Sequence, residues 1–341
     1  MLSLAALASR HLSDTLLLAL EHPPEGDAVL MFDERSELSR LLLGAYRECL
    51  PHARPLDFDR QGPEAVQAVL EQLRAGALAV LIQSSVLRMP EFRTRVELYR
   101  RGVKVVEHAN LDRIEPHQLE HYVAALAYDP LYYREVGHTL KALMDAASAA
   151  RVVSGGEELL FDGPLEPAKL NIGHFAGLKN VGSQFPIGEV FSEARDLERV
   201  HGRVQIYAFA DTSFRLNVPA QPITLVIARG RVVEALNATP EFTQVLSAIR
   251  SDEGQVWLRE LGFGMNRAFS RERYVSDVGA FERVCGVHLS LGAKHGVYKK
   301  PSLNPREARH HVDTFVVTDQ VWLDERLVFA DGGWRATPLS Q

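Results

Sequence analysis

The sequence contains little cysteine and no long apolar run. Only Cys49 and Cys285 are cysteines among 341 residues, so neither a disulfide framework nor a CxxC metal or redox motif is available. No apolar stretch approaches the roughly 20 residues that a membrane span needs, and the N-terminus lacks the basic region of a signal peptide. We therefore expect a cytoplasmic protein with no membrane partner.

Positive charge is also in deficit. The chain has 38 Lys and Arg against 44 Asp and Glu, a formal net charge of −6. Because a protein that binds a phosphate backbone is usually basic, we expect no nucleic-acid partner. Hydrophobic residues make up 46% and charged residues 24%, which is an ordinary globular composition and excludes disordered and fibrous classes.

The first half of the chain lacks the glycine-rich loops that hold nucleotides, since neither GxGxxG nor GxxxxGK[ST] occurs there. Short apolar runs at 28–32, 77–82 and 103–108 predict buried strands, and they alternate with amphipathic stretches. These predicted helices cover residues 36–50, 63–74, 90–101, 116–127 and 130–150. The alternation is typical of an α/β domain with a parallel sheet, which we place at residues 1–150.

After Arg151 the pattern changes to short β-like runs separated by turn residues. The runs are KLNIG, VQIYAF, ITLVIARGRVVEAL, HLSLG, VDTFVV and QVWLD. They predict a mostly antiparallel, β-rich (α+β) catalytic domain over residues 151–341. Within it, Gly230 lies where a tight hairpin turn requires positive φ.

Candidate site residues lie in this second half. In HHVDTFVV, a strand would place His311 and Asp313 on one face, which is half of a common metal site, although a surface ion pair has the same pattern. Glu260 begins an apolar, glycine-rich run after a stretch, 252–259, that we expect to be helical. Glu189 follows a Pro-x-Gly turn, and His288 lies in an otherwise apolar strand, where a buried core histidine is the commoner interpretation.

Together these positions supply two imidazoles and three carboxylates. A two-metal hydrolytic site needs such a set, because a carboxylate must bridge the ions while His, Asp and Glu complete each shell. Oxygen and nitrogen ligands suit Zn, Mn, Co or Fe without choosing among them. From the residues alone, the prediction is a candidate metal site.

The ordered set of four motifs resembles the M29 metallo-aminopeptidases, the family of aminopeptidase T and the thermophilic aminopeptidases. The motifs are FPIGEVF, DEGQVWLRELGFG, VHLSLG and HVD, and they span roughly residues 150–330. The resemblance implies an α/β domain followed by a β-rich catalytic domain. It also implies a homodimer that removes N-terminal residues from short peptides with a metal-activated water.

The resemblance assigns roles to individual residues. It implies two divalent ions, Zn, Co or Mn, bound by a set in which Glu260 is the bridging carboxylate: Glu189, Glu260, His288, His311 and Asp313. Family members carry a tyrosine seven residues after the motif histidine that hydrogen-bonds the reaction intermediate. Here His295 holds that position and Tyr298 is the nearest tyrosine, so either is a candidate catalytic residue beside Glu189 and Glu260. Where several members have a glutamate, this chain has Arg283, preceded by Glu282.

Two alternatives stay open. The same superfamily contains 2,5-dihydroxypyridine dioxygenases, which resemble this fold but hold a single Fe(II) with two histidines and a carboxylate. In those enzymes a histidine replaces the residue matching Glu260, and the match to His288 is lost. The other alternative is a catalytically degenerate binding protein. A basic cluster after His288, formed by Lys294, His295, Lys299 and Lys300, suggests a contact for a substrate carboxylate, or else a solvated loop.

Overall fold

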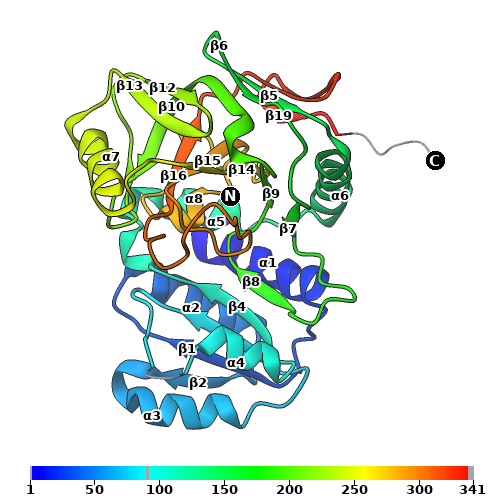
Figure 1. Ribbon diagram of the computed structural model, residues 1–341. Coiled ribbons are helices and arrows are strands. Elements are labelled where there is room, and N and C mark those ends of the chain that lie inside the picture. Colours follow the sequence, from blue (N-terminus) through cyan, green and yellow to red (C-terminus); the bar gives the residue numbers. More distant parts are fainter. Residues whose placement is uncertain (1, 90–91, 337–341) are drawn as a thin grey trace. The chain divides into compact units, whose positions relative to one another are not determined.

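The computed structural model describes residues 2–89 and 92–336, and they form two compact units (Figure 1). The α/β unit extends to Arg134 and adds the later segments Gly173–Ile187 and Arg273–Ala280. The β-rich unit comprises Glu135–Ile172, Gly188–Glu272 and the chain from Phe281 onward. The fold class expected from the sequence is confirmed, and the domain boundary at residue 150 stays a prediction.

The α/β unit is built on a parallel sheet of order β2-β1-β3-β4-β8. Its strands are β1 Ala28–Phe32, β2 Arg54–Asp57, β3 Leu78–Ile82, β4 Lys104–His108 and β8 Gly182–Gln184. The three apolar runs predicted as strands are β1, β3 and β4. Two strands were not predicted: β2, whose first residues are exposed, and β8, which comes from a much later part of the chain.

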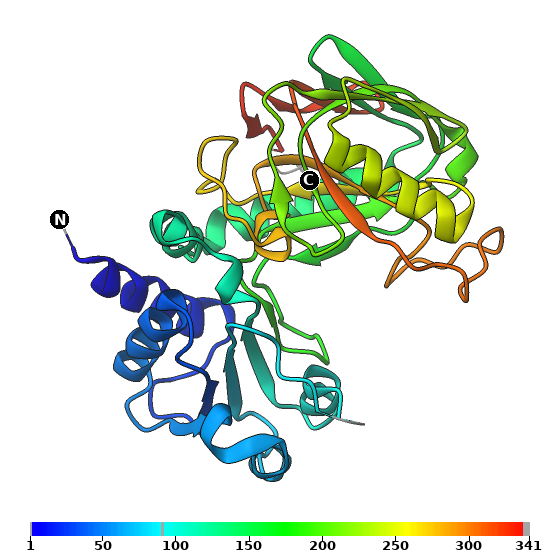
Figure 2. The same cartoon turned by 90° about the vertical axis from the view of Figure 1, so that its left-hand side faces the viewer.

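Helices α2 Glu37–Cys49, α3 Phe58–Glu71 and α4 Thr94–Arg100 pack against this sheet, and α1 Leu4–Asp14 packs on α2 and on α5 Leu119–Ala125 (Figure 2). The unit also has the short turns η1 Thr15–Ala19, η2 Leu111–Arg113 and η3 Pro116–Gln118. On one face of the sheet, Val29, Ala79 and Val105 join Val66 of α3 and Leu98 of α4 in a single buried cluster. Strands β1 and β3 are buried at every residue, and alternate residues of each strand face this cluster, where they meet the apolar stripes of the helices.

The β-rich unit contains an antiparallel sheet of order β19-β18-β17-β5-β6-β10-β16-β15-β14-β9-β7. Its strands are β5 Ala150–Ser154, β6 Glu157–Phe161, β7 Lys169–Asn171, β9 Glu189–Glu193, β10 Val200–Ala210, β11 Leu216–Asn217, β12 Ile223–Ala228, β13 Arg231–Leu236, β14 Leu258–Gly264, β15 Gly286–Leu291, β16 Val312–Val316, β17 Gln320–Leu323, β18 Arg326–Ala330 and β19 Gly333–Trp334. The helices here are α6 Pro130–Ala146, which begins in the α/β unit, and α7 Pro240–Glu253, with the turn η4 Leu197–Arg199; the short α8 Val278–Phe281 lies in the α/β unit except for its last residue.

Two local predictions in this unit have different outcomes. The hairpin is confirmed, because β12 pairs with β13 across a turn in which Gly230 has φ of 70°. The helix expected over 252–259 is wrong. Helix α7 ends at Glu253, where Gly254 with φ of 76° donates its N–H to the carbonyl of Arg250. The following apolar run becomes β14, so Glu260 lies on a strand.

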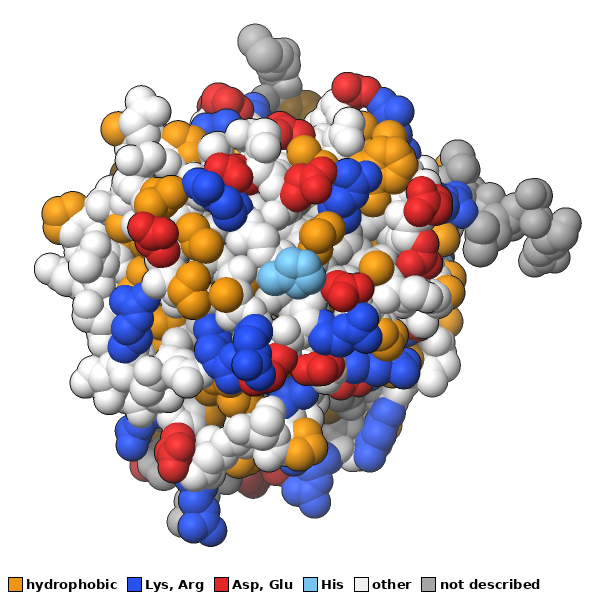
Figure 3. All heavy atoms as spheres, turned by 45° about the horizontal axis from the view of Figure 1, so that its top comes forward, with side chains coloured by type: hydrophobic (Ala, Val, Ile, Leu, Met, Phe, Trp, Pro, Cys, Tyr) orange, Lys and Arg blue, Asp and Glu red, His pale blue; other side chains and the backbone are white. Residues whose placement is uncertain are grey.

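Two surface properties match the composition. On the face drawn in Figure 3, acidic and basic side chains are interspersed rather than gathered into a patch of one sign. Among the described residues, none of the helices has the length and apolar character needed to cross a bilayer.

Candidate metal centre

Four neighbouring strands of the β-rich unit carry the predicted carboxylates and one predicted histidine. Glu189 begins β9, Glu260 lies on β14, His288 on β15 and Asp313 on β16, and these strands are adjacent in the order β9-β14-β15-β16. The register pairs Glu189 with Gly264, Gly262 with His288, and Ser290 with Asp313. Because alternate residues share a face, all four side chains project from the same face.

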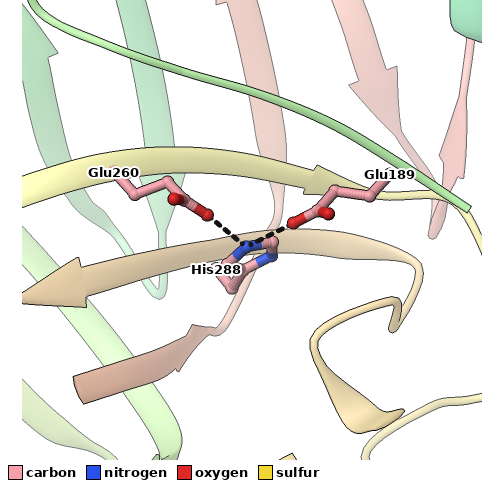
Figure 4. A group of neighbouring side chains, drawn as sticks. All are labelled: Glu189, Glu260 and His288. Carbon is pink, nitrogen blue, oxygen red and sulfur yellow. Dashed lines mark hydrogen bonds and ion pairs between the residues drawn. The ribbon is translucent and has the colours of Figure 1, made fainter. Parts of the chain in front are cut away.

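Three of these side chains converge on one point (Figure 4). The Nε2 atom of His288 lies 3.1 Å from Oε1 of Glu189 and 3.1 Å from Oε1 of Glu260. All three residues are buried, and one ligand atom from each lies within 4.8 Å of the other two. Among the His, Cys, Asp and Glu residues of the described ranges, these three form the group whose ligand atoms all lie this close together.

Gly262 makes room for the imidazole. It faces His288 directly across β14 and β15, and a Cβ atom there would lie 2.0 Å from the His288 ring. No side chain other than glycine leaves that space free. The glycine-rich sequence that follows Glu260 therefore has a packing function within the site.

The electrostatics of the group come from two opposed effects. Burial alone would lower the pKa of His288, but hydrogen bonds and charges of Glu189 and Glu260 outweigh it and raise that pKa well above its ordinary value. Burial alone would likewise raise the pKa of Glu260. Hydrogen bonds from His288 and His295 outweigh that effect, and the pKa of Glu260 is lowered. The centre therefore strongly favours a positive charge between its two carboxylates.

Each of the two carboxylates has its second oxygen fixed by another side chain. Oε2 of Glu189 accepts a 2.6 Å hydrogen bond from Arg283, which also lies 2.7 Å from Oε1 of Glu282. Oε2 of Glu260 lies 2.8 Å from Nε2 of His295. Such contacts hold metal-binding carboxylates in a fixed orientation. Burial is the main cause that raises the pKa of Glu282 to about 8, and the negative charge of Glu189 adds to it.

His311 and Asp313 form a separate pair beside this group. His311 precedes β16, and its Nε2 lies 3.2 Å from Oδ1 of Asp313, as the shared-face prediction requires. Its Nδ1 lies 3.2 Å from the carbonyl of Lys294, to which only an N–H can donate. Burial acts to lower the pKa of His311, but Asp313 outweighs it and the pKa rises to about 10. The structure thus places three of the five predicted ligands in one cluster and two in an adjacent pair.

The structure distinguishes the two candidates for the tyrosine position. His295 reaches Glu260, whereas the Tyr298 hydroxyl lies 2.8 Å from the carbonyl of Pro167 and 3.3 Å from that of Phe191. Burial raises the pKa of Tyr298. The tyrosine hydroxyl is therefore engaged with the main chain, and His295 is the side chain of the two that contacts the cluster.

The lysines of the basic cluster proposed from the sequence differ in their exposure to solvent. Lys294 and Lys299 are exposed. Lys300 is buried, with Nζ 2.6 Å from Oε1 of Glu166 and 3.1 Å from Oε1 of Glu193. Lys300 is thus an internal ion-pair partner, so it does not face solvent as a substrate-binding cation would.

Several supporting residues were not predicted from the sequence. Arg259 is buried against Glu193, and Glu253 binds both ends of the loop that carries His295. The signal for Arg259 was its place in an apolar run, where a charged side chain requires a buried partner. That signal was hidden by the expectation of a helix over these residues.

The cluster fits a divalent cation. Its donor set is two carboxylates and an imidazole, which suits Zn, Mn, Co or Fe. Among buried side-chain atoms without a hydrogen-bond partner in the described chain, three lie here: Nδ1 of His288, Nε of Arg283 and Oδ1 of Asp313, the last of which faces Nε2 of His311 only as an ion pair. Buried polar atoms are normally paired, so this concentration is typical of a site completed by a bound group.

Comparison with known proteins identifies the fold. No protein-family model and no curated protein sequence matches the chain. Among solved structures, the 2,5-dihydroxypyridine dioxygenase of Pseudomonas putida KT2440 superposes with a TM-score of 0.65 and 17% identity, covering 98% of this chain and 99% of that one. Wild-type AmpT from Thermus thermophilus gives a TM-score of 0.57 and 15% identity, covering 98% and 100%. This chain is therefore similar in fold to both proteins.

Proposed function

We propose that this protein is a metal-dependent hydrolase that releases N-terminal residues from short peptides. The observation that carries the proposal is the buried convergence of Glu189 Oε1, Glu260 Oε1 and His288 Nε2. The fold shared with AmpT, an M29 aminopeptidase, is consistent with it. A divalent ion bound there would lower the pKa of a water molecule and polarise a peptide carbonyl.

The side chains around the ion site have distinct roles in this proposal. Glu189, Glu260 and His288 hold the ion, and Arg283 keeps Glu189 in place through its second oxygen. His295 stands where related peptidases use tyrosine, and its Nε2 contacts Glu260, while the Tyr298 hydroxyl contacts main-chain carbonyls. In this proposal His295 orients the second oxygen of Glu260, as a hydrogen-bond partner of an ion ligand does.

The second oxygens of the two glutamates bear on the binding of a second ion. A carboxylate that bridges two ions through both of its oxygens needs both of them free. Here Oε2 of Glu189 is bonded to Arg283 and Oε2 of Glu260 to His295. If a second ion, which the resemblance implies, bound beside His311 and Asp313 and shared Glu260 through both oxygens, His295 would have to leave Oε2 of Glu260. The homodimer and the restriction to short peptides belong to the same proposal.

Hydrolysis of a panel of dipeptides and tripeptides tests the proposal. Protein dialysed against chelator is expected to be inactive and to regain activity with Zn²⁺, Co²⁺ or Mn²⁺. Glu260→Gln should lose activity at least about 100-fold, since it removes an ion ligand. Glu234→Gln, at an exposed position on β13, is the matched control and should retain full activity. Absence of peptide cleavage with every ion would contradict the proposal.

One observation favours a second candidate, a mononuclear Fe(II) dioxygenase. The rings of His295 and His311 lie 5.8 Å apart, beside Asp313, so two imidazoles and a carboxylate occur together. Oxygen consumption with Fe(II) and dihydroxylated aromatic rings, in place of peptide cleavage, would select this candidate. If the protein shows neither activity with any ion, that result would favour a binding protein.

A further inference from the structure

The loop between β15 and β16 is fixed at both of its ends. Residues 292–311 form this loop, which carries His295. The carboxylate of Glu253, at the end of α7, accepts hydrogen bonds from the backbone N–H of Ala293 at 2.7 Å, of Arg309 at 2.6 Å and of His310 at 2.7 Å. A single carboxylate thus joins the first and last parts of the loop.

The same loop determines which nitrogen of His295 carries hydrogen. The backbone N–H groups of Val297 and Tyr298 donate to Nδ1 of His295, at 3.1 and 3.2 Å. Because Nδ1 accepts these bonds through its lone pair, the ring hydrogen lies on Nε2. That nitrogen is the one 2.8 Å from Oε2 of Glu260, so His295 donates to the carboxylate and has no free Nε2 lone pair for an ion.

Arg259 holds the segment that contains this histidine. Its Nε lies 2.8 Å from Oε2 of Glu193, and its guanidinium also donates to the carbonyls of Ala293 and Tyr298, the latter at 3.0 Å. These two carbonyls flank His295 closely in the sequence. Lys300 adds a contact of 3.1 Å to the other oxygen of Glu193. The guanidinium is 2% exposed, so water does not substitute for these bonds.

We propose that Arg259 is a positioning residue that fixes His295 as an Nε2–H donor to Glu260. The guanidinium binds Glu193 and two loop carbonyls at once, an arrangement that lysine, with one compact ammonium, does not reproduce. The loop then presents the histidine with its tautomer already chosen. The consequence for activity rests on the proposed function, whereas the tautomer itself does not.

Nitrogen NMR of ¹⁵N-histidine-labelled protein tests the tautomer directly. The His295 signals, assigned by their loss in His295→Gln, should show hydrogen on Nε2 and none on Nδ1, with and without Zn²⁺. Hydrogen on Nδ1 in the wild-type protein would overturn the inference without any variant of Arg259.

Two variants test the role of Arg259. Arg259→Lys and the milder Glu193→Gln should retain bound Zn²⁺ but give mixed His295 tautomers. In the same variants kcat should fall about ten- to hundredfold with KM within about twofold. Arg203→Lys, at an exposed ion pair with Glu157, is the matched control and should change neither. An unchanged tautomer and unchanged kcat in folded Arg259→Lys and Glu193→Gln would overturn the inference.

The outcomes separate this inference from the proposed function. If the variants show mixed His295 tautomers while the wild-type protein cleaves no peptide, Arg259 positions His295 and the hydrolase proposal fails. If peptides are cleaved and the variants keep both tautomer and kcat, the hydrolase stands and the role of Arg259 is wrong.

Discussion

Two buried histidines, one in each unit, have opposite surroundings. His108 ends β4 of the α/β unit and lies 2.8 Å from the hydroxyls of both Tyr46 and Tyr122. His288 lies on β15 of the β-rich unit between two carboxylates. Both rings are 0% exposed. Burial lowers the pKa of His108 to about 3, whereas the carboxylates raise that of His288 well above its usual value.

The comparison separates a structural histidine from a candidate ligand. The tyrosine hydroxyls satisfy both ring nitrogens of His108 with neutral partners, so that ring is a complete part of the core. His288 instead combines a partnered Nε2 with an unpartnered Nδ1 and the negative charge of two glutamates. Burial is the same in both places, so the neighbouring charges decide which histidine can belong to an ion site.

Gly262→Ala should have the largest effect on the difference between His288 and His108. The added Cβ would lie 2.0 Å from the His288 ring and force it away from the carboxylates. We expect Zn²⁺ affinity, measured by competition with a chromophoric chelator, to fall about 10- to 100-fold or more. Gly333→Ala, where no atom lies within 4 Å of the new Cβ, is the control and should bind normally. Unchanged affinity in Gly262→Ala would mean that His288 is not a ligand.

Lowering the pH should destabilise the α/β unit through His108. Below pH 6.5 the unfolded chain gains a proton that the folded ring, with its pKa of about 3, refuses. Its stabilising contribution is therefore complete above pH 6.5 and is lost by about 1.4 kcal/mol per pH unit down to about pH 3. Hydrogen exchange of β1, β3 and β4 measures this loss, while the tryptophans, Trp257, Trp322 and Trp334, report on the β-rich unit. His108→Gln should flatten the pH slope, and an equal slope in both proteins would reject the assignment.

Glu253→Gln tests whether the loop beside His288 depends on its two fixed ends. The neutral amide accepts hydrogen bonds less strongly than the carboxylate that now holds three backbone N–H groups. We expect the free energy of local opening of residues 292–311 to fall by about 1–3 kcal/mol, measured by hydrogen exchange. Protection in the α/β unit should not change. Equal loop protection in Glu253→Gln would show that other contacts hold the loop.

The smallest effect is expected at the exposed cation Lys299. If it contacts a substrate carboxylate, Lys299→Glu should raise KM for acidic peptides about two- to fivefold, the scale of exposed charge pairs. Lys179→Glu, on an exposed segment of the α/β unit, is the control. An unchanged KM in Lys299→Glu would place that cation among the solvated side chains.

The sequence predicts those parts of the fold that depend on local periodicity. The apolar runs at β1 and β3, the alternation that pairs His311 with Asp313, and the hairpin at Gly230 all follow from neighbours in the chain. The convergence of Glu189, Glu260 and His288 depends on the register of three strands brought together from distant segments. No local pattern encodes that register, and motif resemblance supplied the grouping instead.

The error near Arg259 has a similar cause. Helix α7 ends where Gly254 adopts positive φ, but the polar residues on both sides continue a helical pattern in the sequence. The buried partners of Arg259, Glu193 and two carbonyls of a later loop, become visible only when β9, β14 and that loop are assembled. A buried arginine therefore could not be assigned its role from its own segment.

Equilibrium dialysis against Zn²⁺ tests the central claim most directly, with bound metal counted per chain in the wild-type protein and in Glu260→Gln. We predict that the wild-type chain retains a tightly bound ion and that Glu260→Gln loses it, with Glu234→Gln unchanged. No bound ion in the wild-type protein, or equal binding in Glu260→Gln, would contradict the assignment of Glu189, Glu260 and His288 as a metal centre.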